Sequence, residues 1–215
     1  DSLAGEMAGA RRLLTDLAQK LGPDVRVIPA PCVGRCDQAP VAIVGQGPVP
    51  RASVDDVARQ VERKAFTCPV AKYIDYDQYR ANGGYGLLRQ CLSGERDAES
   101  VIKAMENSGL RGLGGAGFPA GRKWRIVRAG PPPRVMAVNI DEGEPGTFKD
   151  RYYLERDPHR FLEGMLIAAW AVGIDDIYVY LRDEYHACRQ LLERELAALK
   201  ANPPAKLPRI SLRRG

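Results

Sequence analysis

A glycine-rich segment is the first place where this sequence could do chemistry. Residues 109–121 hold six glycines in 13 positions, and Arg122, Lys123 and Trp124 follow directly. Because glycine has no Cβ atom, the backbone amides of such a loop can close around phosphate oxygens or a flat ring. The basic and aromatic flank favours an anionic, planar ligand. A flexible loop without a ligand is the simpler alternative.

Two familiar phosphate-binding patterns fail to explain this segment. Gly112, Gly114 and Gly117 fit G-x-G-x-x-G formally, but the dinucleotide-binding version follows a strand, and the residues before Gly109 predict a helix. The P-loop version fails as well, because the residues after Gly121 lack the required Lys-Ser/Thr pair. The loop therefore indicates a ligand without identifying it.

An acidic segment is the second place. Asn139, Asp141, Glu142 and Glu144 directly follow a predicted buried strand at 135–138. Open α/β sheets bind ligands at the carboxyl ends of their strands, where these side chains could hydrogen-bond a polar ring edge or ribose hydroxyls. The alternative is an acidic turn rich in Gly and Pro.

A cysteine pair is the third place. Cys32 and Cys36 form a C-x3-C pattern in a loop bounded by Gly and Pro. Two thiolates at this spacing can hold one iron of an iron–sulfur cluster, whereas zinc ligands more often come as C-x2-C. Two reduced structural cysteines are the alternative. Cys68, Cys91 and Cys188 stand alone, and Cys188 falls on the apolar face of a predicted helix.

The two histidines do not suggest a catalytic system. His159 and His186 both lie near the start of a predicted helix, where surface or capping roles are expected. No His-centred nucleophile is apparent, so a hydrolase is disfavoured. We therefore expect no catalytic side chain and a bound cofactor that carries the chemistry.

Composition limits the class of protein. The 215 residues are 45% hydrophobic and 27% charged, with a net charge of +5 spread along the chain, so nucleic-acid binding is not expected. No apolar run approaches the ~20 residues that span a bilayer. Five cysteines without a secretory signal indicate a reducing compartment and predict a cytoplasmic protein.

The hydrophobic pattern predicts two α/β blocks. Residues 1–64 form the first block, 65–96 an ordered connector, and 97–215 a second block whose strands form a largely parallel sheet flanked by helices. In the first block and the connector we expect helices at 3–21, after Ser53 and near 87–92, and strands at 25–28 and 41–44. In the second block we expect helices at 97–107, 157–173 and 185–199, and strands at 135–138 (buried on both faces), 177–181 and 210–212.

Three long motifs carry a family resemblance. Residues 111–124, 139–151 and 157–165 closely resemble the FMN- and NADH-binding, 51 kDa-type flavoprotein subunit of respiratory NADH dehydrogenase. The same module occurs in the diaphorase subunits of NAD-reducing hydrogenases and NAD-dependent formate dehydrogenases. Residues 32–40 are similar to the second cysteine pair of the thioredoxin-like, 24 kDa-type subunit, which carries a [2Fe-2S] cluster. The combination of both modules in one chain most resembles the β subunit of a formate dehydrogenase.

The resemblance implies a fold and a set of ligand contacts. It predicts a partial thioredoxin-like domain followed by a modified Rossmann-like FMN-binding domain. Leu113 stands where many relatives have Arg, and Ile126 where an aromatic ring can stack on adenine. By position, FMN contacts fall on Gly112, Gly114, Lys123, Asn139, Asp141 and Glu142, NAD contacts on Gly115, Phe118 and Glu144, and cluster ligands on Cys32 and Cys36.

The resemblance also implies a reaction and further parts. Hydride would pass between NAD(H) and FMN, and electrons would then move through iron–sulfur clusters to a molybdenum- or tungsten-containing catalytic subunit. The first cysteine pair is expected before Asp1, a Tyr-x-Cys-Gly-Glu-Glu segment after Gly215, and [4Fe-4S] ligands later still. The equivalent subunit of NADH dehydrogenase or hydrogenase, or a non-catalytic redox docking module, are the alternatives.

Overall fold

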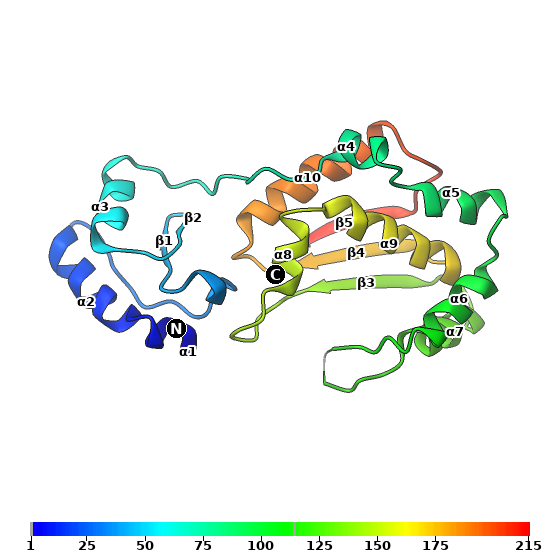
Figure 1. Cartoon of the computed structure of the whole chain (residues 1–215), viewed down its shortest axis with the longest axis horizontal. Coiled ribbons are helices and arrows are strands. Elements are labelled where there is room, and N and C mark those ends of the chain that lie inside the picture. Colours follow the sequence, from blue (N-terminus) through cyan, green and yellow to red (C-terminus); the bar gives the residue numbers. More distant parts are fainter. Residues whose placement is uncertain (1, 114) are drawn as a thin grey trace.

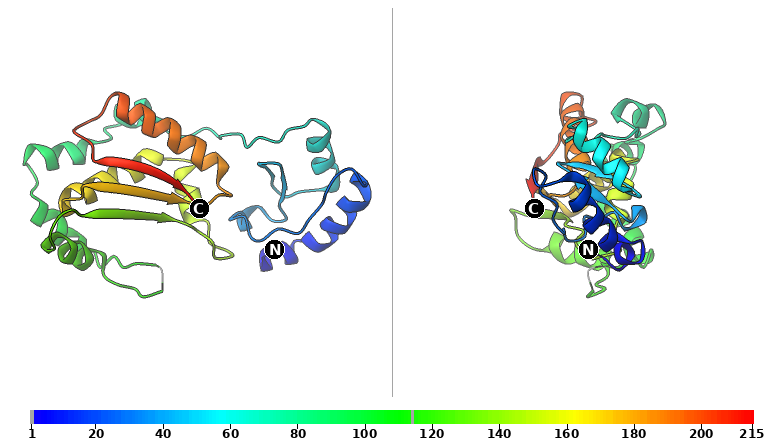
Figure 2. Two further views of the ribbon diagram at one scale, coloured as in Figure 1. Left: turned by 180° about the vertical axis from the view of Figure 1, so that it is seen from behind. Right: turned by 90° about the vertical axis from the view of Figure 1, so that its left-hand side faces the viewer.

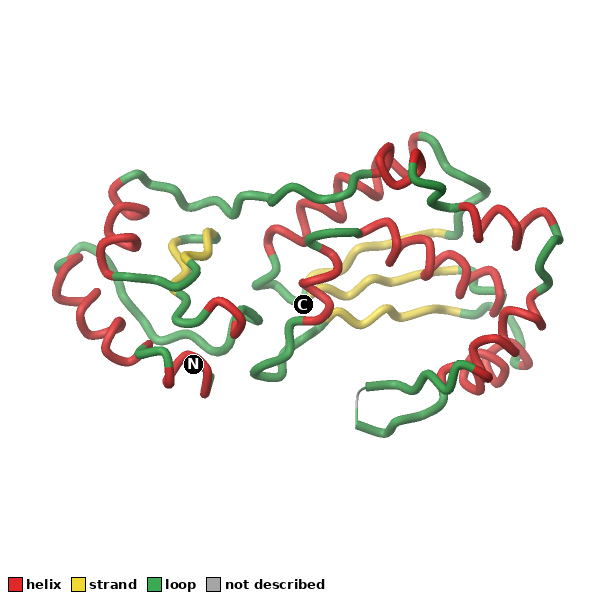
Figure 3. Tube along the Cα trace, in the orientation of Figure 1, coloured by secondary structure: helices red, strands yellow, loops and turns green. Residues whose placement is uncertain are grey.

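The computed structural model describes residues 2–113 and 115–215 and shows two unequal lobes (Figure 1). Residues 65–75 run between them without helix or strand (Figure 3). The small lobe contains α1 (Leu3–Met7), α2 (Ala10–Leu21), a 3-10 turn (Cys36–Gln38), β1 (Ala42–Val44), β2 (Gly47–Val49) and α3 (Val54–Glu62). The large lobe contains α4 (Tyr76–Ala81), α5 (Gly86–Ser93), α6 (Ala98–Asn107), α7 (Ala120–Ala129), β3 (Val135–Ile140), α8 (Lys149–Leu154), α9 (Pro158–Val172), β4 (Asp176–Leu181), α10 (His186–Ala201) and β5 (Arg209–Arg214).

The small lobe departs from the sequence prediction in two places. The helix expected at 3–21 is divided, because Gly9 adopts a left-handed φ of 86° and begins α2. The strand expected at 25–28 is wrong: these residues are irregular, and within the described residues β1 pairs with β2 alone. Val27 packs against the core of the small lobe, but Ile28 is exposed, and the segment has no strand partner for its backbone groups.

The helix after Ser53 begins as predicted. The Ser53 hydroxyl accepts a hydrogen bond from the amide of Asp56 at 3.2 Å, which satisfies one of the free amides at the start of α3. Val57 is then buried against Leu17 and Val44 in the core of the small lobe. Local capping chemistry thus determines where α3 starts, and its apolar face determines where the helix packs.

A parallel sheet organises the large lobe. The strands lie in the order β3-β4-β5, and both pairs are parallel. Alternate β4 residues Ile177, Val179 and Leu181 are buried in one apolar cluster with residues of α9 and α10. Parallel strands need crossover connections, and α9 and α10 supply them. The predicted α/β class and parallel sheet are confirmed.

The prediction that β3 is buried on both faces is wrong. Val135 is 53% exposed, and Ile140 is the buried member of the strand. Within the described residues β3 is an edge strand, and α9 covers one face of the sheet while the other face is open in the left view of Figure 2. A continuous apolar run therefore does not show whether both faces of its strand are covered.

The glycine-rich segment joins two packed helices. Asp97 caps α6 as predicted, with its carboxylate 2.6 Å from the amide of Ser100. Helix α7 packs against α6, and both contact α9. A Cβ atom on Gly121 would lie 2.5 Å from the backbone nitrogen of Glu106. This glycine is therefore needed for close helix packing rather than for a ligand.

His159 corrects another prediction. We expected it at the surface or in a cap, but its side chain is fully buried at the start of α9. Nδ1 lies 2.7 Å from the Tyr85 hydroxyl, and Nε2 lies 2.7 Å from the carboxylate of Glu195 in α10. The histidine is therefore a structural link between three elements.

Glu163 of α9 is the centre of a second buried polar group. Its carboxylate accepts hydrogen bonds from the Tyr79 hydroxyl at 2.6 Å, the Tyr85 amide at 2.9 Å and the Leu88 amide at 3.1 Å. A buried carboxylate is tolerated only when such donors surround it. Residues 79–88, within the predicted connector, are thereby fastened to α9. The boundaries predicted at 64 and 96 stay predictions.

None of the described helices combines the length and the apolar character needed to cross a membrane.

Candidate functional site

The glycine-rich loop is closed at its base and projects from the α6–α7 pair (Figure 1). Arg111 and Pro119 form an isolated antiparallel bridge. The amide of Gly112 donates to the carbonyl of Phe118 at 2.9 Å, and the Arg111 guanidinium donates to the carbonyl of Gly117 at 3.0 Å. The loop is therefore held by its own backbone at the base.

The tip of this loop is open. Gly115 and Gly117 have φ values of 91° and 59°, which side chains rarely adopt, and a Cβ atom on either would meet no atom within 4 Å. Their backbone conformation, not a lack of space, therefore requires glycine. Leu113 is 80% exposed and Phe118 is 38% exposed. The predicted FMN contact Gly114 lies outside the described residues.

Lys123 lies in the first turn of α7, where the loop enters the helix. Its side chain is exposed, and α7 begins after Pro119 without a side-chain cap. The first amides of a helix carry a partial positive charge and lack partners within the helix. Together with the lysine charge, they make this end of the loop suited to an anionic group such as a phosphate.

The carboxyl end of β3 presents three exposed polar side chains. Asn139, Asp141 and Glu144 are all exposed. The amide oxygen of Asn139 accepts a hydrogen bond from the backbone nitrogen of Asp141 at 2.8 Å, which turns the chain as the strand ends. The Asn139 amide nitrogen and the Asp141 and Glu144 carboxylates are left facing solvent, so they can accept a ligand.

Glu142 differs from its neighbours because its carboxylate is used by the protein. The side chain is buried and accepts hydrogen bonds from the amides of Asp150 and Arg151, at 2.9 and 3.3 Å, at the start of α8. The Tyr185 hydroxyl donates a further bond at 2.8 Å. Burial and this bond raise the pKa of Tyr185, so it stays a donor. The predicted flavin contact of Glu142 stays a prediction, and its carboxylate is already occupied.

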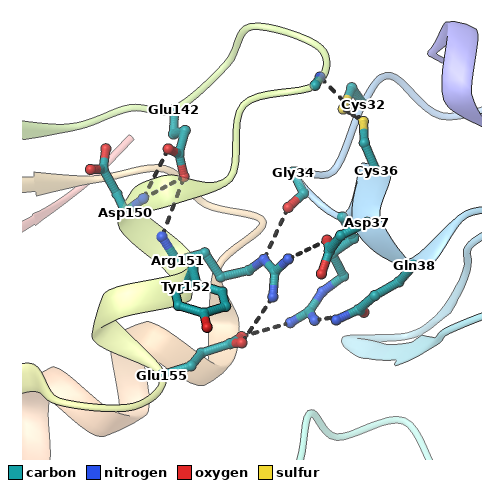
Figure 4. Close-up of polar contacts among 12 residues, drawn as sticks. Cys32, Gly34, Cys36, Asp37, Gln38, Glu142, Asp150, Arg151, Tyr152 and Glu155 are labelled. Atoms are coloured by element: carbon teal, nitrogen blue, oxygen red, sulfur yellow. Dashed lines mark hydrogen bonds and ion pairs between the residues drawn. The ribbon is translucent and has the colours of Figure 1, made fainter. Parts of the chain in front are cut away.

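The two predicted cluster ligands lie together beside this segment (Figure 4). The sulfur atoms of Cys32 and Cys36 are 3.4 Å apart, and the sulfur of Cys36 accepts a hydrogen bond from the amide of Gly146 at 3.3 Å. Burial opposes ionisation, but hydrogen bonds with Ser2, Cys32 and Gly146 lower the pKa of the Cys36 thiol. The pair therefore has the spacing and chemistry of two ligands to one metal ion.

The other cysteines do not extend this pair. Cys68, Cys91 and Cys188 are buried, and burial raises the pKa of each thiol, which disfavours the thiolate that a metal needs. Cys188 is a core residue of α10, as predicted. Among the described residues, no group of three or more His, Cys, Asp or Glu could hold a metal ion.

Arg151 joins the cysteine loop (residues 32–37) to the large lobe, and its local sequence did not indicate this role. Its side chain is almost fully buried. It donates to the carbonyl of Gly34 at 2.9 Å, to Asp37 at 2.5 Å and to Glu155 at 2.9 Å (Figure 4). Arg35 of the cysteine loop reaches the same Glu155 at 3.1 Å. The cysteine-loop partners are more than 110 residues away in sequence, so no local pattern indicates them.

Arg182 makes a second link at the end of β4. It donates to the backbone carbonyl of Cys32 at 2.8 Å and to that of Glu142, and it pairs with Glu184 at 2.9 Å. One guanidinium thus touches both the cysteine loop and the acidic segment. The position of Arg182 directly after a predicted strand could have marked it as a site residue, but the partners of its side chain could not be predicted.

The predicted site residues therefore fall into two groups. Asn139, Asp141, Glu142 and Glu144 belong to the segment whose Gly146 contacts Cys36, whereas Gly112, Gly115, Phe118 and Lys123 belong to the projecting loop and the start of α7. Between the described residues of 109–121 and 139–148, no hydrogen bond or ion pair is formed.

The parallel sheet, the projecting glycine-rich loop and the polar end of β3 define an α/β protein with exposed polar groups where open α/β sheets bind ligands. Residues 105–215, just over half of the chain, match the family described as the Nuo51 FMN-binding domain. The chain belongs to this family, which confirms the resemblance seen in the sequence.

Several relatives support the assignment. The chain is 46% identical over 125 residues to an NADH-quinone oxidoreductase subunit of Rhizobium meliloti (strain 1021), covering 58% of this chain and 30% of that protein. It is 36% identical over 196 residues to NAD-reducing hydrogenase HoxS subunit alpha of Cupriavidus necator, covering 79% of this chain and 32% of that protein. The chain thus spans about a third of the length of these relatives.

A solved structure resembles the whole chain. The crystal structure of an NAD+-reducing [NiFe]-hydrogenase in the H2-reduced state superposes with a TM-score of 0.77 at 28% identity, covering 100% of this chain and 42% of that one. The air-oxidized state of the same type of enzyme gives a TM-score of 0.72. The arrangement of both lobes therefore has a counterpart among known structures.

Proposed function

We propose that this chain is part of a subunit that binds FMN and NAD(H) and exchanges hydride between them. The observation that carries the proposal is the family match over residues 105–215, which includes the glycine-rich loop, Lys123 and the acidic segment. The matching region also contains the exposed amides and polar side chains that such ligands need.

The residues present fit FMN. The uncapped start of α7 and the exposed Lys123 can hold a phosphate group. Asn139 and Asp141 offer a donor and an acceptor for the polar edges of the ring or the ribityl chain. FMN, when bound, would supply the ability to accept a hydride and release single electrons. The task of these residues is to hold and orient it.

NAD(H) would meet exposed residues of both segments. Phe118 can pack against a flat ring, and Glu144 can accept hydrogen bonds from ribose hydroxyls. A carboxylate in that place would also repel the 2′-phosphate of NADP, so we propose a preference for NAD(H). The exposed Leu113 and Ile126 offer no charge or ring for the nucleotide.

Cys32 and Cys36 fit two ligands of a [2Fe-2S] cluster. Their sulfur atoms are 3.4 Å apart, and the Gly146 amide already donates to one of them. A cluster of this type needs four ligands, so the other two would come from outside the described residues, and a [4Fe-4S] cluster would lie elsewhere in the complete subunit. The contact with Gly146 supports a path for electrons between the acidic segment and the cysteine pair.

We propose that the complete subunit works in a cytoplasmic NAD-dependent formate dehydrogenase, with a catalytic subunit that contains iron–sulfur clusters and molybdenum or tungsten. A hydrogenase-type complex is the second candidate, because the hydrogenase structure covers the whole chain, small lobe included. Reduction of NAD+ by formate or by hydrogen in the purified complex, together with its molybdenum, tungsten and nickel content, distinguishes them.

Flavin content tests the central proposal. The complete subunit should purify yellow, release FMN on denaturation and oxidise NADH with an artificial acceptor. A protein that folds but stays colourless after anaerobic incubation with FMN would contradict the proposal and favour a non-catalytic docking module.

Cysteine substitution tests the cluster. Cys32→Ser and Cys36→Ser should each abolish or shift the EPR signal of the [2Fe-2S] cluster while flavin stays bound. Cys91→Ser is the matched control, since that buried thiol belongs to α5, at the end of the large lobe that lies away from the small lobe (Figure 1). Intact signals in both loop variants would return these thiols to a structural role.

A further inference from the structure

The cysteine loop (residues 32–37) and the acidic segment come from different lobes, yet two buried arginines of the large lobe donate hydrogen bonds to the cysteine loop. Figure 4 shows the bonds of the first, Arg151. We propose that Arg151 and Arg182 are positioning residues that hold Cys36 under the amide of Gly146 and so set the reduction potential of the cluster. This inference rests on the proposed cluster role of the cysteine pair. The contacts themselves do not depend on it.

Arg151 supplies the geometry for the first link. It is 1% exposed, and its Nε, Nη1 and Nη2 atoms all have acceptors within 2.9 Å. Two of these acceptors, Gly34 and Asp37, belong to the cysteine loop, whereas Glu155 lies at the C-terminal end of α8. A planar guanidinium with fixed donors on both sides leaves little freedom for one segment to shift against the other.

Arg182 supplies the second link through backbone atoms. Its guanidinium donates to the carbonyls of Cys32 and Glu142. It therefore fixes the main chain of the cysteine loop at a predicted cluster ligand and the main chain of the acidic segment at its buried carboxylate. Glu184 balances its charge at 2.9 Å. A lysine could provide the charge, but its single ammonium would not reproduce the planar fork.

Close packing at Gly34 makes this arrangement specific. Gly34 has a φ of 69°, and a Cβ atom there would overlap the ring and hydroxyl of Tyr185. That same hydroxyl donates to Glu142, two residues from Glu144. The cysteine loop therefore passes directly over the phenol that holds the acidic segment, and a displacement of either segment must move the other.

A displacement of the two segments against each other would weaken the Gly146–Cys36 hydrogen bond. Hydrogen bonds to the sulfur ligands are among the features that set the potential of an iron–sulfur cluster. A donor stabilises the more negative, reduced state, so loss of this donor should lower the potential. An arginine that served only to stabilise the fold would leave the potential unchanged in any variant that still folds.

The test uses the complete subunit and three variants. Arg151→Lys keeps the charge but loses the fork, and Asp37→Asn removes one charged acceptor of the cysteine loop with little change of shape. Arg209→Gln is the matched control, because Arg209 forms an exposed pair with Asp176 at the far end of the sheet. Flavin content, the EPR-monitored redox titration and hydrogen exchange of residues 29–40 and 141–148 are measured in each.

We expect Arg151→Lys and Asp37→Asn to keep flavin and EPR signal, to lower the cluster potential, and to speed exchange in both segments by about tenfold. The Arg209 control should match the wild type. Unchanged potential and exchange in Asp37→Asn and Arg151→Lys would overturn the inference, as would equally faster exchange throughout the protein. If Arg151→Lys does not fold, Asp37→Asn decides. A wild-type protein without a cluster would defeat the proposed function, and hydrogen exchange would still test the coupling of the two segments.

Discussion

The contact between the cysteine loop and the acidic segment differs sharply from the glycine-rich loop. At the contact, Arg151 and Arg182 are buried and hydrogen-bonded across the two lobes. The glycine-rich loop is bonded at its base and exposed at its tip, where a Cβ atom on Gly115 would meet no neighbouring atom. The polar groups that join the two lobes are satisfied within the protein, whereas the predicted ligand contacts at the tip of the loop are left open.

The carboxylates of residues 141–144 show the same contrast between groups bonded within the protein and groups open to solvent. Glu142 is surrounded by donors from α8 and Tyr185 and supports the structure, while Asp141 and Glu144 face solvent. Residue type alone did not show which of these three carboxylates would be buried. Substitutions at the contact should therefore change stability, and substitutions at the open positions should change ligand binding.

The largest effect is expected for Arg151→Ala. It leaves Glu155 and Asp37 without their shared partner, and breaking a buried ion pair costs about 3–5 kcal/mol. Asp37 is partly exposed, so we expect a loss of about 3 kcal/mol in unfolding free energy, measured by urea denaturation. Arg209→Ala, at an exposed pair, should cost less than about 1 kcal/mol. Equal losses of unfolding free energy in the two variants would contradict the proposed difference between the buried contact and an exposed ion pair.

Lys123→Ala tests the open loop. It should weaken FMN retention by about 1–2 kcal/mol, or roughly five- to thirtyfold in Kd, because one charge-assisted hydrogen bond is lost at an exposed position. Unfolding free energy should not change. Fluorescence titration of the deflavinated subunit measures the affinity, with Lys103→Ala on α6 as control. Equal affinity in the Lys123 variant and the wild type would place the phosphate elsewhere.

Glu144→Gln tests nucleotide choice. At ~4 Å and an effective dielectric near 20, two unit charges interact by about 4 kcal/mol before screening, and a quarter of that gives several-fold discrimination. The variant should therefore raise the ratio of kcat/KM for NADPH over NADH several-fold. The exposed Glu193→Gln on α10 is the control. A constant ratio would mean that Glu144 does not face the ribose.

The smallest expected effect is a loss of unfolding free energy at low pH. The hydrogen bond from Arg182 lowers the pKa of Glu184 from its ordinary value of 4.5. A carboxyl whose pKa is lower in the folded state contributes stability above the unfolded pKa and loses it as the pH falls through the folded pKa. Because Glu184 is 37% exposed, we expect less than about 1 kcal/mol. Urea midpoints from about pH 6 to about pH 3 should fall less in Glu184→Gln than in the wild type, because the other carboxyls with lowered pKa values titrate in both proteins.

Local signals predicted much of the fold. Ser53, Asp97 and Asp157 each cap the helix that the sequence assigned to them, because a cap involves neighbours in the chain. The order of strands and crossover helices likewise predicted a parallel sheet. The strand expected at 25–28 failed, since apolar residues alone do not provide a pairing partner.

Long-range polar partners were not predictable. The roles of Arg151 and Arg182 depend on residues more than 110 positions away, and the burial of His159 depends on Tyr85 and Glu195. Nothing in their local sequence distinguishes them from exposed residues of the same type. The same holds for Glu142, whose motif position suggested a ligand but whose carboxylate is used by α8.

The donors around Glu163 have a practical consequence for anyone who wishes to transfer the large lobe into another protein. A gene segment cut at residue 97 would carry α9 but leave behind Tyr79, Tyr85 and Leu88, which supply the three hydrogen bonds to that carboxylate. The shortened piece would then leave this carboxylate without its three donors, so the acid would have to take up a proton or bond water. A transplantable unit should therefore start upstream of Tyr73, whose hydroxyl bonds Glu195.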